Sequence, residues 1–156
     1  MDTVTPDQFY KHLDDVMAGM LGAGNAAAVP MSHYVERDTN TLFFITARQT
    51  DLAQASRSPA EAVYMLADPK ANLWARIHGT LTAVTDPAHL DEFWGRVPAA
   101  WFEGGKDDPD VQLLRLDLRE AEVWATDGGA KFLFEIARAN VTGAKPDVGD
   151  HGHIRF

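Results

Sequence analysis

The sequence predicts an α+β fold built on an antiparallel β-barrel of about six strands with flanking helices. Three observations lead to this prediction. Segments rich in β-branched and aromatic residues recur along the chain, and short groups of turn-forming residues separate them. The regular alternation of strand and helix that is typical of a parallel sheet is missing. At 156 residues the chain fits one domain, and it contains no internal repeat.

A first helix is expected to begin at Pro6, because Thr5 can cap it and Gln8 can complete a capping box. The face that this helix would bury consists of apolar residues at helical spacing, namely Phe9, Leu13, Val16, Met17 and Met20. The pattern therefore predicts a helix that continues toward residue 20.

The next segment is expected to be extended from residue 27 to residue 35, since Pro30 disfavours a helix. The polar residues 36–40 form a predicted turn, and residues 41–46 are rich in β-formers, so the two segments are interpreted as a hairpin. A short helix from Asp51 to Arg57 follows, with Thr50 as its cap.

Two more strands are expected over residues 62–66 and 73–84, joined by a turn at 68–72. Gly79 lies inside the longer strand, where a glycine is typical of a bulge or a barrel corner. A helix is expected to start at Asp86-Pro87, to bury Leu90, Phe93, Trp94 and Val97, and to end or bend at Pro98.

The last third of the chain is predicted to contain an exposed loop at 103–110, a strand at 111–124 and a final helix. In the strand, Leu114, Leu116 and Leu118 share one face. The helix would begin near Ala130, bury Phe132, Leu133 and Ile136, and stop at Gly143. The expected domain therefore spans residues 1–143, and residues 144–156 form a C-terminal tail that we expect to be loosely held.

The charge of the chain limits its partners. With 23 acidic and 14 basic side chains the formal net charge is −9, which argues against binding to nucleic acid. The absence of cysteine excludes disulfides and thiolate sites and is compatible with a reducing compartment. No apolar run has the length of a signal-peptide core or a membrane helix, so we expect a cytoplasmic protein without membrane contact.

Few residues point to a particular chemistry. The motifs of esterases, nucleotide hydrolases and dinucleotide-binding folds are missing. His151 and His153 lie close in sequence but have no further ligand at metal-binding spacing, so no metal site is expected. The large aromatic residues are a better indication, although each alone fits a core or an interface equally well. They are Trp74, Trp94, Trp101, Phe102 and Trp124.

Five segments, taken in order, carry a family resemblance. They are Val29 to Met31, Leu42 to Thr46, Ile77 to Thr80, Trp101 to Asp110 and Glu120 to Trp124. Together they closely resemble the pyridoxamine 5'-phosphate oxidase-like proteins of the general stress protein 26 type. The motif W-F-x-G-G-x-D-D-P-D followed by E-A-E-x-W is the specific part. The resemblance implies a split β-barrel, a homodimer, and two flavin mononucleotide (FMN) sites between the subunits.

The resemblance also implies a set of cofactor-binding positions and no catalytic side chain. These positions are Val29, Pro30, Met31, Ile45, Thr46, Arg48, Thr50, Leu52, Trp74 and Trp124. The sequence departs from the family at the expected phosphate anchor. Val29 replaces an arginine, and Asp51 and Leu52 stand where positive charge is expected, which weakens the binding of a phosphate dianion. Arg48 is the nearby cation that could substitute.

Three functions follow as hypotheses. The first is a flavin-binding redox protein in which the flavin performs the electron chemistry, a possible oxidoreductase. Oxidation of pyridoxamine phosphate itself is not expected, because few basic residues remain for a second phosphate. The second is a degenerate member that has lost the phosphate anchor and binds a less anionic ligand without catalysis. The third is a structural dimer whose aromatic surfaces serve assembly or a protein partner.

Overall fold

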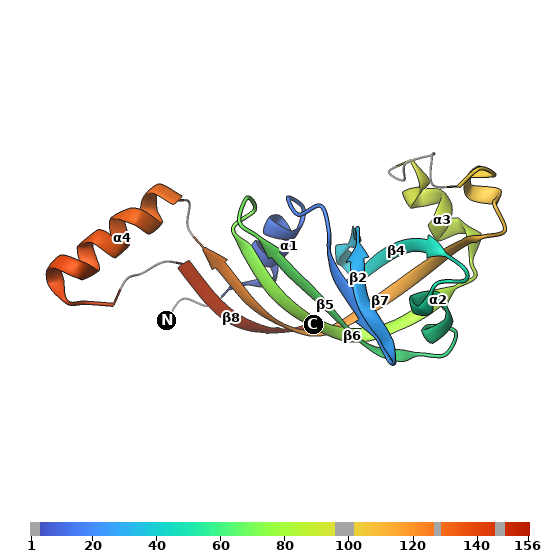
Figure 1. Ribbon diagram of the computed structural model, residues 1–156, viewed down its shortest axis with the longest axis horizontal. Coiled ribbons are helices and arrows are strands. Elements are labelled where there is room, and N and C mark those ends of the chain that lie inside the picture. Colours follow the sequence, from blue (N-terminus) through green and yellow to red (C-terminus); the bar gives the residue numbers. More distant parts are fainter. Residues whose placement is uncertain (1–3, 96–101, 127–128, 146–148) are drawn as a thin grey trace.

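The computed structural model describes residues 4–95, 102–126, 129–145 and 149–156, and Figure 1 shows a strongly curled sheet with helices around it. The strands are β1 (Gly19–Ala23), β2 (Ala26–Met31), β3 (Tyr34–Glu36), β4 (Thr41–Ala47), β5 (Ala60–Asp68), β6 (Leu73–Val84), β7 (Val111–Thr126) and β8 (Gly149–Arg155). The helices are α1 (Pro6–Leu13), α2 (Asp51–Ala55), α3 (Pro87–Trp94) and α4 (Gly129–Thr142). In the described part of the chain, none of them combines the length and apolar character needed to cross a bilayer.

All strand pairs among the described residues are antiparallel, and the order across the sheet is β2-β1-β5-β6-β7-β4-β3. β8 pairs with β7 outside this order. The sixteen-residue β7 is the longest described strand, and β6 pairs with it from residue 113 to residue 125. On its other side, β7 pairs first with β4 and then with β8. The result is an α+β fold with an open, curled half-barrel of eight described strands in place of the expected six.

The start of α1 is confirmed and its predicted extension is wrong. The backbone N–H of Gln8 donates to Thr5 Oγ1 at 3.2 Å, and the backbone N–H of Thr5 donates to Gln8 Oε1 at 2.9 Å. The helix ends at Leu13, and Met17 is 84% exposed. Residues 19–23 form β1 instead, because Gly19 disfavours a helix and because strands β2 and β5 pair with this segment on both sides.

Most of the predicted strands are confirmed. The extended segment 27–35 is divided into β2 and β3, and β3 forms the predicted hairpin with β4. Thr50 caps α2 as expected, and β6 has the predicted bounds. The register between β6 and β7 shifts at His78/Gly79, as expected for a bulge. A Cβ atom at Gly79 would lie 2.2 Å from the carbonyl oxygen of Asp117, so only glycine fits there.

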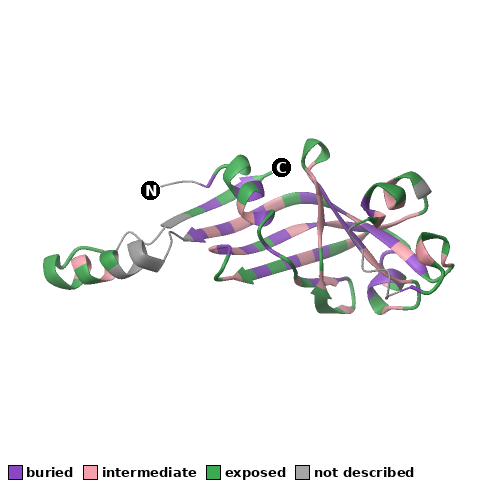
Figure 2. Cartoon of the chain, turned by 90° about the horizontal axis from the view of Figure 1, so that it is seen from above, coloured by how far each residue is buried: buried purple, intermediate pink, exposed green. Residues whose placement is uncertain are grey.

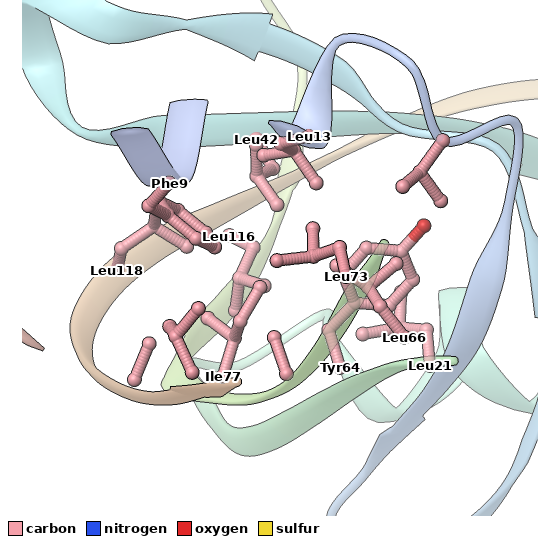
Figure 3. Close-up of a cluster of buried hydrophobic side chains, with 14 of the residues drawn as sticks. Phe9, Leu13, Leu21, Leu42, Tyr64, Leu66, Leu73, Ile77, Leu116 and Leu118 are labelled. Carbon is pink, nitrogen blue, oxygen red and sulfur yellow. The ribbon is translucent and has the colours of Figure 1, made fainter. Parts of the chain in front are cut away.

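The core fills the concave side of the sheet (Figure 3). Large apolar residues from α1 and six of the strands meet there, and Tyr64 is the largest fully buried side chain of the described residues. On β7, Leu114, Leu116 and Leu118 point into the core as predicted. A smaller cluster of Phe43, Phe93 and Leu113 holds α3 against the sheet. Val97, Pro98 and Trp101 lie outside the described residues.

The prediction of a loosely held C-terminal tail is wrong for residues 149–156. β8 pairs with β7 over seven residues, and Ile154 is only 4% exposed. The ring of Phe156 lies 5.7 Å from that of Phe9, which ties the end of the chain to α1. The error has a physical cause, because this strand is polar and its conformation depends on pairing with β7 and not on its own periodicity.

Helix α4 ends as predicted, since Gly143 has a φ of 73° and its N–H bonds to the carbonyl of Ala139 at 2.8 Å. Its predicted burial is not found at Ile136, which is only partly buried, and Phe134 is 64% exposed. The side chains of Phe132 and Leu133 lie outside the description. Figures 1 and 2 both place α4 beyond the end of the sheet.

Candidate functional site

A groove of about 440 Å³ runs over the outer face of the sheet, which is the face opposite the core. We call it the tryptophan groove. Its walls are formed mainly by Met20, Pro30, Met65, Trp74, Arg76 and Trp124. These side chains come from five neighbouring strands, and the register makes Trp74 a direct cross-strand neighbour of Trp124. The groove is therefore largely apolar, with two indole rings and one cation.

The alternation of strand residues explains why these side chains meet. On β6, Leu73, Ala75 and Ile77 are buried in the core, so Trp74 and Arg76 point to the other face. The same alternation places Met65 opposite Arg76 and next to Met20. Met20 and Met65 are 41% and 48% exposed, which is high for large apolar side chains.

Three polar side chains lie beside the groove, on the side where β7 pairs with β8. Arg76 forms an ion pair with Glu122, and Glu122 also accepts a hydrogen bond from His151 Nε2 at 3.0 Å. The imidazole ring of His151 stacks on the indole of Trp124, with ring centroids 4.9 Å apart and planes inclined by 5°. These contacts connect the C-terminal strand to two residues of the tryptophan groove.

A second group of predicted site residues lies where β4 meets α2. We call Thr46, Arg48 and Thr50 the threonine–arginine corner. The two threonine hydroxyls are 3.2 Å apart, and Thr50 also donates to the carbonyl of Ala47 at 2.9 Å. Arg48 is exposed, and its side chain makes no hydrogen bond or ion pair with any described residue. Because Thr50 gives its hydroxyl proton to Ala47, Thr46 is the donor in the contact between the two threonines, and the guanidinium of Arg48 is the donor of this corner that has no partner among the described residues.

The structure does not bring these two groups together within one chain. Thr46 lies opposite Gln112 on β7, and Trp124 follows twelve residues later on the same strand. At roughly 3.3 Å per residue, this places the two groups about 40 Å apart along β7. Figure 1 shows the two ends of β7 on opposite sides of the molecule. One small ligand therefore cannot contact both groups in a single chain.

The remaining predicted residues occupy other positions. Pro30 lines the tryptophan groove, and its neighbour Val29 is exposed at the sheet edge. Ile45 packs against the small cluster under α3. Leu52 is only 2% exposed and belongs to the core, so its side chain is not available to a ligand. Met31 contributes a carbonyl oxygen to the network described next.

A buried network supports β2 behind the groove. Tyr64 Oη lies 2.9 Å from the carbonyl oxygen of Met31 and 2.7 Å from His33 Nδ1, and His33 Nε2 lies 3.1 Å from the carbonyl oxygen of Leu13. Burial lowers the pKa of His33 below its ordinary value, with smaller opposing effects from the Leu13 carbonyl and Asp14. The network fixes the end of β2, where Pro30 enters the groove.

Several of these residues were missed in the sequence. The sequence pattern predicts a helix at Met20 and a loosely held tail at His151, whereas both residues lie on strands. Arg76 could have been found, because it lies two residues from Trp74 on a predicted strand and therefore shares its face. Among the described residues, no group of three or more histidine, aspartate or glutamate side chains is gathered closely enough to hold a metal ion.

The family described as Pyridoxamine 5'-phosphate oxidase like matches residues 5–147. A candidate general stress protein 26 from Jannaschia sp. CCS1 is 42% identical, with a TM-score of 0.87, over 95% of this chain and 96% of that one. No curated protein matches the sequence.

Two structures from Xanthomonas are also similar. The general stress FMN/FAD binding protein of Xanthomonas citri is 31% identical, with a TM-score of 0.71, over 80% of this chain and 90% of that one. A candidate general stress family protein of Xanthomonas campestris pv. campestris is 33% identical, with a TM-score of 0.69, over 80% and 88% of the two chains.

Proposed function

The chain belongs to the pyridoxamine 5'-phosphate oxidase-like family, and from this premise we propose that it is a flavin-binding redox protein whose cofactor, FMN, lies between two copies of the chain. The tryptophan groove of one copy holds the isoalloxazine ring, and the threonine–arginine corner of its partner holds the phosphate. The observation that carries the proposal is the position of these two groups at opposite ends of β7. One ligand can contact both groups only if they come from two different chains.

The tryptophan groove has the character that a flavin ring requires. Two indoles and two methionines provide flat and adaptable apolar contacts, and burying them against a ligand and a second subunit is favourable. The structure of a relative from Xanthomonas citri that is described as an FMN/FAD binding protein supports this ligand class. When bound, the flavin supplies the hydride or electron chemistry.

The residues of the chain position and anchor the cofactor in this proposal. Arg48 and the hydroxyls of Thr46 and Thr50 would replace the missing basic residues at the phosphate. A hydrogen bond to a charged group contributes about 1.5–3 kcal/mol, so Arg48 is the residue on which phosphate binding depends most. Asp51 lies beside them at the start of α2 and opposes an anion.

A second candidate function is a dimer that binds a neutral or apolar ligand without redox chemistry. The burial of Leu52 and the hydrogen bond between Thr46 and Thr50 favour it. Leu52 offers no polar group to a ligand, and the two hydroxyls already have each other as hydrogen-bond partners without a bound anion. The same groove would hold such a ligand. The two candidates differ in whether a phosphate group adds to the affinity.

Titration with FMN and, in parallel, with riboflavin separates the candidates, because the two ligands differ only in the phosphate. We expect FMN to bind at least about tenfold more tightly than riboflavin, and Arg48→Ala to abolish this preference, since one charge-assisted hydrogen bond is worth that much. Arg57→Ala is the control, as Arg57 is an exposed cation just beyond the other end of α2.

Equal affinities for FMN and riboflavin would support the second candidate. If neither flavin binds, the proposed cofactor is wrong. Sedimentation equilibrium at micromolar concentration tests the dimer, and a monomer would refute the division of the site between two chains.

A further inference from the structure

We infer that His151 is a positioning residue of the tryptophan groove, which fixes the indole of Trp124 directly and the guanidinium of Arg76 through Glu122. The geometry stands without any ligand. Its consequence for flavin affinity rests on the proposed function. His151 belongs to β8, so the C-terminal strand takes part in the site.

The contact between His151 and Trp124 joins two neighbouring strands. The two residues are cross-strand partners in the register of β7 and β8. Their rings are almost parallel, at 5°, with centroids 4.9 Å apart, which is an offset stacked arrangement. Trp124 lines the groove and His151 does not, so the imidazole supports the indole from outside the groove.

Glu122 extends this support to the cation of the groove. One carboxylate oxygen, Oε1, accepts from His151 Nε2, and the other, Oε2, is paired with Arg76. The carboxylate therefore holds both partners at once, and it favours a proton on Nε2 of the imidazole. If His151 is removed, Trp124 loses its support and Glu122 interacts with Arg76 alone.

Protonation of His151 changes the charge beside the groove. The groups around the imidazole are Glu122 from β7 and Arg76 from β6, and His153 is the next outward residue on its own strand. With neutral imidazole, the charges of Arg76 and Glu122 cancel. With imidazolium, the group carries one net positive charge, which faces the π-surface of Trp124.

His153 provides a matched control on the same strand. Its Nε2 lies 3.6 Å from Glu120 Oε2, so it also faces a carboxylate of β7 and is similarly exposed. No stacking of His153 on an aromatic ring is found among the described residues. A substitution at His153 therefore changes the charge of β8 without touching Trp124.

The first experiment follows tryptophan fluorescence of the flavin-free protein between pH 8 and pH 5, because imidazolium in contact with an indole quenches its emission. We expect the emission of wild type and His153→Gln to fall with pH, and that of His151→Gln to respond much less. His151→Phe keeps a flat ring on Trp124 but cannot take a proton, so its emission should also lack the response. Trp124→Phe should lack it as well, which identifies the indole.

A full response in His151→Gln, or an equal loss of response in His153→Gln, would overturn the inference. The second experiment measures FMN affinity over the same pH range. The affinity of wild type should exceed that of His151→Gln about two- to tenfold, the factor that corresponds to one stacked aromatic pair, because the loss of the imidazole frees the indole that faces the flavin ring. Absence of FMN binding would refute the proposed function, while the fluorescence result would still decide the role of His151.

Discussion

Replacing Tyr64 with phenylalanine tests whether the buried network behind β2 stabilises the fold. Tyr64 is fully buried, and its hydroxyl lies within hydrogen-bond distance of the Met31 carbonyl and of His33 Nδ1. Phenylalanine keeps the ring and its packing against Phe44. The change therefore removes one hydroxyl and leaves two partly buried polar groups without their partner.

The expected cost follows from these contacts. A net hydrogen bond contributes about 0.5–1.5 kcal/mol, and a buried group left unsatisfied costs about 1–3 kcal/mol. We expect Tyr64→Phe to lower the free energy of unfolding by about 2 kcal/mol, toward the middle of the combined range. The expected loss is smaller than that of three full hydrogen bonds. Neutral His33 and Tyr64 each carry one donor proton, so only two of the three contacts in the network can be hydrogen bonds at the same time.

Urea unfolding at pH 7.5 measures this difference, and an unchanged m-value would show that the variant unfolds in the same way. Tyr10→Phe is the control, since Tyr10 donates a single bond of 2.8 Å to the side chain of Asn40, which can turn toward water. We expect that variant to lose less than about 1 kcal/mol. If Tyr64→Phe loses no more than Tyr10→Phe, the network does not stabilise β2.

Three further predictions concern the fold. Burial lowers the folded-state pKa of His33 below 6.5, so His33 contributes stability above pH 6.5 that is lost as the pH falls through the lowered pKa. The free energy of unfolding in urea should therefore fall less toward pH 5 in His33→Gln than in wild type. Equal losses in the two proteins would contradict this. Gly79→Ala should cost about 1–3 kcal/mol in the same assay, because its Cβ would meet the Asp117 carbonyl, whereas Gly95→Ala, with nothing within 4 Å, should be neutral. Ile154→Ala should cost about 2 kcal/mol and speed hydrogen exchange in β8, and unaltered exchange would mean that β8 does not depend on this contact.

The sequence predicts the fold best where a segment carries its own signal. β6 is rich in alternating apolar residues and lies between clear turns, so both of its bounds could be predicted. β1 and β8 contain glycines and polar residues, and they are strands because β5 and β7 offer them partners. A property that depends on a partner distant in sequence is not visible in local periodicity.

The same distinction applies to the candidate site. Trp74 and Trp124 were predicted from the family resemblance, and the register places them side by side. The separation of the threonine–arginine corner from the groove could not be predicted, because it depends on the length of β7 and on which strands pair with each half. His151 was missed for the same reason, since its role depends on the pairing of β8.

One edge of β7 pairs with β4 over residues 111–117 and with β8 over residues 120–126, so a chain without β8 leaves the second half of this edge unpaired. A chain made only as far as Gly143 would contain the whole of β7 but not the strand that covers residues 120–126. The backbone N–H and C=O groups of that half would then be free to recruit a strand from another molecule. Strand β8 thus replaces the open edge of β7 by a polar edge of its own, and we expect chains that end at Gly143 to aggregate more readily than the full chain when light scattering is followed at equal concentration.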